Sequence, residues 1–212
     1  MKLLSRSASV FFLALVIFLV LNAPALITRY RPAKGPVGYL PSVSDNSTPL
    51  AEGLHIPRLG ITAPIDYEVE ATDEPRLLKQ LESGTVHLLG TARPGEIGNS
   101  VVVGHSSNYP WDRGNYKTIF APLERLMIGD YIQLQRGSQR YVYQVSAKRV
   151  VQPTDLAVLG QTTQPQLTLI TCTPIGTTLR RLIVVANQLS PDPSAATPFT
   201  ASPLVQAIPG PR

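Results

Sequence analysis

Short runs of apolar and β-branched residues, separated by turn residues, dominate the middle of this 212-residue chain. In the segment 129–145, "GDYIQLQRGSQRYVYQV", Ile132 and Leu134 alternate with polar residues before the turn "RGSQ". Alternation with a period of two is typical of half-buried strands, so this segment predicts a β-hairpin. Further strand-like runs occupy residues 53–65, 98–105, 166–172 and 181–186. Many short strands with little helix predict a closed or sandwich-like all-β domain.

The best helix candidate inside this domain is the segment 73–84, "DEPRLLKQLESG". Asp73 can cap the first turn, Pro75 suits its beginning, and Gly84 can end the helix. The spacing of Leu77, Leu78 and Leu81 predicts that they share one face. In the run 53–65, Pro57 and Pro64 indicate an edge strand or a barrel corner.

The N-terminus carries a run without charged residues, from Ala8 to Ile27, which follows Lys2 and Arg6. Its length of about 20 residues matches a membrane-spanning helix. The run therefore predicts a single-pass membrane helix, with residues 1–29 forming a cytoplasmic stub and an anchor.

A cleaved signal peptide is the alternative for the same region. The most apolar part, residues 10–21, resembles an h-region, and residues 23–25, "APA", resemble a small-residue cleavage site. We favour the uncleaved anchor, because Leu26 and Ile27 extend the apolar run beyond the potential cut. Both alternatives place the rest of the chain outside the cytoplasm.

Two segments rich in proline and small polar residues flank the predicted domain. Residues 30–50 are rich in Pro, Gly and Ser and predict a linker that holds the domain off the membrane. Residues 190–212 are rich in Pro and Ser and predict a disordered tail. The folded unit is then 51–189, an ordinary size for one domain.

Charge and cysteine content exclude several classes of function. The net charge is +5, but only 16% of residues are charged and the basic ones are scattered, which argues against a nucleic-acid-binding surface. A weak attraction to anionic lipid or wall polymer is compatible with this charge. A single cysteine excludes an intramolecular disulfide, and no Cys/His spacing or acidic cluster predicts a metal site. We therefore predict no cofactor and no metal.

The only cysteine, Cys172, ends the predicted strand 166–172. A free cysteine is most often a small buried hydrophobic residue. An extracytoplasmic thiol without a disulfide partner is open to oxidation, which suggests that it is kept for a chemical purpose. Its place at a strand end, beside a loop, also favours a functional residue. Cys172 is the candidate nucleophile.

A histidine and an arginine are candidate partners of Cys172. His105 follows a predicted strand and precedes a polar loop long enough to line a cleft, although a solvated loop histidine is the alternative. If strands 166–172 and 181–186 pair antiparallel, their connection brings Arg180 or Arg181 near the thiol. A guanidinium there favours the thiolate and can hold an oxyanion. The alternative is a surface arginine that ends an edge strand.

Two other histidines are weaker candidates. His87 lies in the segment "SGTVHLLGTARPG", which is rich in turn residues and predicts a loop. His55 lies in the first predicted strand, and we expect it to be structural.

The segment "TLITC", followed by a short loop and "RLIVVA", resembles the TLxTC…R signature of the sortase family. The segments "LHIPRLGITAPI", "GTARPGEIGNSVVVGH" and "TIFAPLERLMIGDYIQL" also resemble segments of that family, in the same order. This resemblance spans most of residues 54–186 and implies a closed eight-stranded sortase-type β-barrel with one or two short helices. It also implies that Cys172 is the nucleophile, His105 the general acid/base, and Arg181 the family's arginine.

The resemblance implies a cysteine transpeptidase at the cell membrane, with its catalytic domain outside the cytoplasm. Such an enzyme cleaves a C-terminal LPxTG-type sorting motif of a surface protein and forms a thioacyl intermediate. An amine of peptidoglycan or of a pilin subunit then accepts the acyl group. The loop after His105 is longer than in the simplest family members, so we assign no subgroup.

Two alternatives remain beside this interpretation. An L,D-transpeptidase would carry a Ser-His-Gly-Cys type signature, which "LITCTP" lacks, and the papain-type signature is also absent. The second alternative is a membrane-tethered β-barrel module that only binds, with Cys172 buried and inert. A thiol reagent would separate the two classes, because an inert core cysteine reacts only after unfolding.

Overall fold

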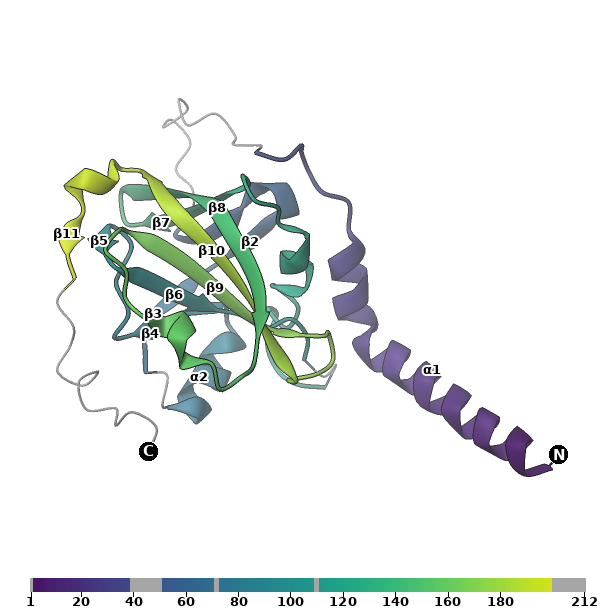
Figure 1. Cartoon of the computed structure of the whole chain (residues 1–212). Helices are drawn as coiled ribbons and strands as arrows, with labels where there is room; N and C mark the ends of the chain where they lie inside the picture. Colours follow the sequence, from purple (N-terminus) through teal and green to yellow (C-terminus); the bar gives the residue numbers. More distant parts are fainter. Residues whose placement is uncertain (1, 39–50, 71–72, 109–110, 200–212) are drawn as a thin grey trace.

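A computed structural model describes residues 2–38, 51–70, 73–108 and 111–199. Its centre is a nine-stranded sheet in the order β2-β1-β7-β8-β10-β9-β6-β4-β3, which curls into a nearly closed barrel (Figure 1). Its strands are β1 (Gly53–Ile56), β2 (Ile61–Ala63), β3 (Ile65–Glu70), β4 (Thr85–Leu89), β6 (Asn99–Val103), β7 (Tyr131–Arg136), β8 (Gln139–Val151), β9 (Gln166–Thr173) and β10 (Arg180–Ser190). The predicted all-β barrel is confirmed.

Two α-helices and four 3-10 helices accompany the barrel in the described part of the chain. They are α1 (Lys2–Tyr30), α2 (Glu74–Leu81), η1 (Pro57–Leu59), η2 (Ala121–Arg125), η3 (Leu156–Leu159) and η4 (Pro193–Ala195). A separate two-stranded sheet pairs β5 (Glu96–Ile97) with β11 (Thr197–Pro198) in parallel.

The main sheet has nine strands, one more than the eight that the resemblance implied and three more than the six that the sequence pattern assigned. One reason is the first apolar run, which forms two strands because Pro57 opens the 3-10 helix η1 and Gly60 turns the chain at φ 63°. A second reason is that β3 and β4 are strands in segments that sequence patterns did not assign. Burial of β4 on both faces removes the alternation by which an isolated strand is recognised.

The two faces of the sheet pack against separate apolar cores. Successive residues of a strand point to opposite faces, so β9 contributes Leu167 and Leu169 to the barrel interior and Ile170 to the outer face. The outer face is covered by Leu81 of α2 and Val158 of η3. The site therefore has a packed sheet beneath it and short helices beside it.

The helix α2 begins as predicted. The Asp73 carboxylate accepts a hydrogen bond from the backbone N–H of Arg76 at 3.1 Å, and Pro75 lies in the first turn. Leu77 and Leu81 pack on the outer core, whereas Leu78 is 50% exposed and does not share the buried face as expected.

The predicted hairpin is also confirmed. Strands β7 and β8 pair antiparallel from Tyr131↔Gln144 to Arg136↔Gln139, and Gly137 makes the turn at φ 56°. The strand β8 then continues to Val151, beyond the expected hairpin, because its second half pairs with β10.

The helix α1 projects from the barrel at its N-terminal end (Figure 1). Residues 8–30 have a mean hydropathy of 2.7 in their most apolar window, so this helix is long and apolar enough to cross a membrane. Its last turns pack on the domain: Ala25 is only 2% exposed and contacts Ala121 and Ile175. The Arg29 guanidinium forms an ion pair with Glu124 at 2.5 Å.

The described part of the expected linker runs along the domain. The Lys34 N–H donates to the Arg58 carbonyl at 2.8 Å, and the Gly38 N–H donates to Asp130 Oδ1 at 3.0 Å. Residues 39–50, most of the expected linker, lie outside the described residues.

The expected tail begins later than Ser190. Residues 193–195 form η4, and Thr197 pairs with Glu96 in the small sheet. This corrects the expectation of disorder from Ser190 onward, because strand pairing and a capped turn order the chain there. Residues 200–212 lie outside the described residues.

Candidate active site

Cys172 and Arg181 lie directly opposite each other on paired strands. The strands β9 and β10 pair antiparallel, as predicted, with Cys172 aligned to Arg181 and Thr173 aligned to Arg180. Residues directly opposite in an antiparallel pair share a face, with Cβ atoms about 4.5–5.5 Å apart. Arg181, and not Arg180, is therefore the arginine on the same face as the thiol.

His105 reaches the same level from the other side of β9. The strand β6 runs parallel to β9, with Val103 aligned to Ile170. His105 lies two residues after Val103, and Cys172 lies two residues after Ile170, so the two residues are at the same level. The strands stay together up to that point, because the Gly104 N–H donates to the Ile170 carbonyl at 3.2 Å. The Thr171 hydroxyl donates to the Gly104 carbonyl at 2.7 Å. Cys172 therefore lies between His105 and Arg181.

The backbone before His105 is held by close packing. A Cβ atom at Gly104 would lie 2.6 Å from the ring of Phe120, which is almost completely buried. The Phe120 N–H donates to the His105 carbonyl at 2.9 Å. Only glycine fits at position 104, and the histidine backbone is fixed on both sides.

The β9–β10 loop, residues 174–179, holds the Arg181 side chain. Arg181 Nη1 donates to the carbonyls of Thr178 at 2.9 Å and Arg180 at 3.3 Å. The Gly176 N–H donates to the Ser107 hydroxyl at 2.8 Å, which ties this loop to the segment after His105. The two loops that border the site are thus linked to each other.

All three candidate side chains are partly exposed. Burial lowers the pKa of His105, and the carboxylates of Asp112 and Glu82 oppose that shift. The imidazole is therefore predominantly neutral at neutral pH, which is the form that can accept a proton.

The other two histidines are separate from this site. His87 was expected in a loop but lies in β4, aligned with the interior residue Val102, so it faces the barrel interior. Its Nε2 lies 2.9 Å from the Ala92 carbonyl oxygen, and burial lowers its pKa to about 4. His55 lies in β1, as predicted, with Nε2 2.6 Å from the Ala51 carbonyl oxygen.

Sequence reasoning missed the apolar floor beside Cys172. Residues of the same face as Cys172 and Arg181 continue along the sheet as Val103, Ile170 and Ile183, next to Leu159 of η3. The apolar residues occur at every second position of β6, β9 and β10, but the three strands must be aligned before these residues can be recognised as one surface. Between α2 and η3 this floor is covered, since Ile170 and Ile183 are buried, and only Val103 and Leu159 are partly exposed.

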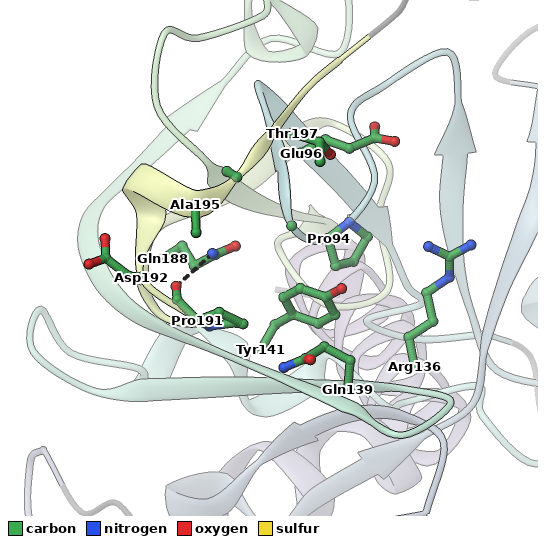
Figure 2. Close-up of a pocket in the computed structure, with 12 residues that line it drawn as sticks. Pro94, Glu96, Arg136, Gln139, Tyr141, Gln188, Pro191, Asp192, Ala195 and Thr197 are labelled. Atoms are coloured by element: carbon green, nitrogen blue, oxygen red, sulfur yellow. Dashed lines mark hydrogen bonds between the residues drawn. The ribbon is translucent and has the colours of Figure 1, made fainter.

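A cavity of about 300 Å³ lies elsewhere in the domain (Figure 2). It is lined by Tyr141, by Gln188 near the end of β10, and by Asp192. Arg181 lies near the other end of the same strand, and none of the three candidate residues lines the cavity. The cavity is therefore distinct from the candidate active site.

The part of the chain that the structure describes offers no cluster of metal-ligating side chains. Those residues contain no group of three or more His, Cys, Asp or Glu side chains placed to hold a metal ion.

The fold and the site define a class: all-β barrel proteins that bring a cysteine, a histidine and an arginine together at the ends of three neighbouring strands. The family model described as Sortase domain matches residues 54–189, so the chain belongs to the sortase family, whose members are transpeptidases.

Relatives and solved structures agree with this assignment. The chain is 32% identical over 80 residues to YwpE of Bacillus subtilis (strain 168), a protein named as a sortase, covering 36% of this chain and 78% of YwpE. The Clostridium perfringens sortase D5 transpeptidase superposes with a TM-score of 0.54 at 27% identity, over 65% of this chain and 78% of that one. Clostridium perfringens sortase C with the C-terminal cell wall sorting motif superposes with a TM-score of 0.54 at 27% identity, over 65% and 69% of the two chains.

Proposed function

We propose that this sortase cleaves an LPxTG-type sorting motif near the C-terminus of a surface protein and transfers the acyl part to an amine. Cys172 is the nucleophile, His105 the general acid/base, and Arg181 the group that stabilises the oxyanion. The observation that carries the proposal is the alignment of Arg181 with Cys172 across β9 and β10, with His105 at the same level on the β6 side.

The first half of the reaction forms a thioester. His105 takes the proton of the Cys172 thiol, and the thiolate attacks a backbone carbonyl carbon within the sorting motif. The Arg181 guanidinium stabilises the negative charge that develops on the carbonyl oxygen. When the C–N bond breaks, the imidazolium of His105 gives its proton to the departing amine, and Cys172 keeps the acyl group.

The second half transfers the acyl group. An amine of peptidoglycan or of a pilin subunit attacks the thioester carbonyl, while His105 accepts a proton from that amine. The Cys172 thiolate leaves, regains its proton, and the new amide is released. Water in place of the amine would give hydrolysis.

The apolar floor supports a substrate with apolar residues ahead of the scissile bond. Val103 and Leu159 are partly exposed apolar side chains on this face, next to the buried Ile170. Burying such side chains contributes about 25 cal/mol per Å². The similar Clostridium perfringens sortase C was solved with the C-terminal cell wall sorting motif, which supports the same substrate class here.

The proposed cellular arrangement follows from α1. Residues 1–29 include the single-pass anchor, residues 51–189 are the catalytic domain, and that domain lies outside the cytoplasm. The apolar helix of residues 8–30 supports this arrangement by its length and composition.

Mass spectrometry of the full chain tests the chemistry. The protein is mixed with an LPxTG-type peptide, with and without an amine acceptor. We expect a thioacyl adduct on Cys172 without acceptor, and a transpeptidation product when the acceptor is present. Cys172→Ala should abolish both species. Thr173→Ala is the matched control, because the neighbouring side chain lies on the other face of β9.

A different result would favour the non-catalytic alternative. If native Cys172 takes up neither the peptide nor a small thiol reagent, the thiol is inert. The protein would then be a tethered binding module built on the sortase fold.

A further inference from the structure

The β9–β10 loop lies alongside the membrane helix and not beyond its end. Gly176 is so close to Asn22 that an added Cβ atom would lie 2.5 Å from the asparagine side chain. Ile175 packs against Ala25 and Leu26. Figure 1 shows the loop between β9 and β10 on the side of the barrel that faces α1. The loop therefore reaches back along the last two turns of the helix.

The length of α1 determines how deep the contacts between the β9–β10 loop and this helix would lie in a bilayer. The hydrocarbon core is about 30 Å thick and needs about 20 helical residues. Large apolar side chains from Val10 to Val20 are exposed by 38–81%, whereas the domain partly covers the helix from Leu21 onward. The freely exposed part from Ala8 to Val20 spans only about 20 Å, at about 1.5 Å per residue. A complete span must therefore include turns on which the domain packs.

Charged side chains mark the level of the lipid headgroups. Arg29 and Glu124 form an ion pair, and the Arg125 guanidinium donates to the backbone carbonyls of Arg29 and Arg31. Lys148 Nζ donates to the carbonyl of Glu124 at 2.7 Å. Basic side chains beside a membrane helix are attracted to anionic headgroups. The contacts of the loop with α1 precede this cluster along the helix and so lie on its membrane side.

The β9–β10 loop is uncharged and partly apolar, which suits a position at the membrane–water interface. Residues 174–179, "PIGTTL", contain no charged side chain, and Leu179 is 67% exposed. Trp111, in the loop that follows His105, is also 67% exposed. Tryptophan is enriched at membrane–water interfaces.

We propose that the β9–β10 loop lies in the interfacial region of the outer leaflet, with Leu179 in contact with lipid. This rests on the proposed anchoring by α1 and not on the chemistry of Cys172. The loop is bordered by Cys172 and Arg181, so the mouth of the site faces the membrane surface. The peptides that reach it most directly are those that emerge from the same membrane.

Depth-dependent fluorescence quenching in liposomes tests the contact. The full chain carrying Trp111→Phe, which removes the only tryptophan, is the background. Leu179→Trp reports on the loop, and Leu189→Trp is the matched control, because it is an exposed leucine near the far end of β10. The liposomes contain phosphatidylcholine and phosphatidylglycerol with acyl chains brominated close to the headgroup.

We expect brominated lipid to quench the fluorescence of the Leu179→Trp variant about twofold or more, with a blue-shifted emission, as for an interfacial indole. The emission of the Leu189→Trp variant should be unaffected. Equal quenching of both variants, or no quenching of Leu179→Trp, would overturn the proposal. Thioacyl formation is measured on the same samples, so a failed membrane contact with intact chemistry is distinguished from a failure of the proposed function.

Discussion

The two adjacent arginines at the start of β10 provide the sharpest test of the site. The perturbation is Arg181→Ala, compared with Arg180→Ala on the neighbouring residue. Arg181 is aligned with Cys172 and shares its face, whereas Arg180 is aligned with Thr173, one position on, and so lies on the other face. Two chemically identical truncations, one residue apart, should therefore differ in their effect on catalysis.

The magnitude of the effect follows from the proposed role of the Arg181 guanidinium as an oxyanion donor. Arg181 is held by the carbonyls of Thr178 and Arg180, so it is oriented before substrate binds. Removal of one such oxyanion donor costs about 10²–10³ in kcat, or about 2.7–4 kcal/mol of transition-state stabilisation. Arg180 is exposed and lies on the face opposite Cys172, so its truncation removes no oxyanion donor and should leave kcat essentially unchanged.

The assay is the steady-state rate of transpeptidation with an LPxTG-type peptide and an amine acceptor, together with single-turnover acylation of Cys172. Thermal unfolding of each variant confirms that the fold is retained. The reasoning is refuted if Arg180→Ala loses as much activity as Arg181→Ala. It is also refuted if the activity of Arg181→Ala stays within about tenfold of the unchanged protein, since the expected loss is larger.

Three further predictions concern stability. Gly104→Ala forces a methyl group against the buried ring of Phe120, so it should lower the free energy of unfolding by about 1–3 kcal/mol and reduce activity, as measured by urea denaturation and turnover. Asp130→Ala leaves the Arg58 guanidinium without its carboxylate partner at 2.7 Å and should cost about 3–5 kcal/mol, which a urea midpoint near that of the unchanged protein would contradict. His87 has a folded-state pKa of about 4, below its value of about 6.5 in the unfolded chain, so the unfolded chain binds the proton more readily and stability falls as pH drops below about 6.5. Between about pH 7 and pH 5 the contribution of His87 to this loss should be about 2 kcal/mol, and that contribution should be absent in His87→Gln, as followed by urea denaturation at each pH.

Local patterns in the sequence were enough to predict the all-β class and several elements. Alternation in β7 and β8 predicts the hairpin, because side chains of a strand that is packed on one face must alternate with solvent-facing ones. The cap of α2 was predictable for a similar reason, since the Asp73 side chain satisfies a backbone N–H three residues away. The resemblance of the segments around His105 and Cys172 to the sortase family also needed no structure.

Strands buried on both faces were not predictable in the same way. In β4, residues 85–88 are all buried, so no alternation marks them as a strand. The turn residues around His87 predicted a loop, although this histidine lies in a strand and faces the barrel interior. Its neighbours from β3 and β6 supply the environment that makes it a strand. A local pattern cannot contain information that depends on those partners.

Tertiary structure decides which arginine faces the thiol and which segments contact α1. Physical reasoning from the residues left Arg180 and Arg181 open, and only the resemblance to the sortase family favoured Arg181. One residue of strand register places Arg181 on the face of Cys172 and Arg180 on the opposite face. The close approach of Gly176 to Asn22 joins segments that are far apart along the chain, at the junction of the β9–β10 loop and α1. Periodicity and spacing describe neighbours along the chain, whereas register and docking depend on how distant segments bury their surfaces together.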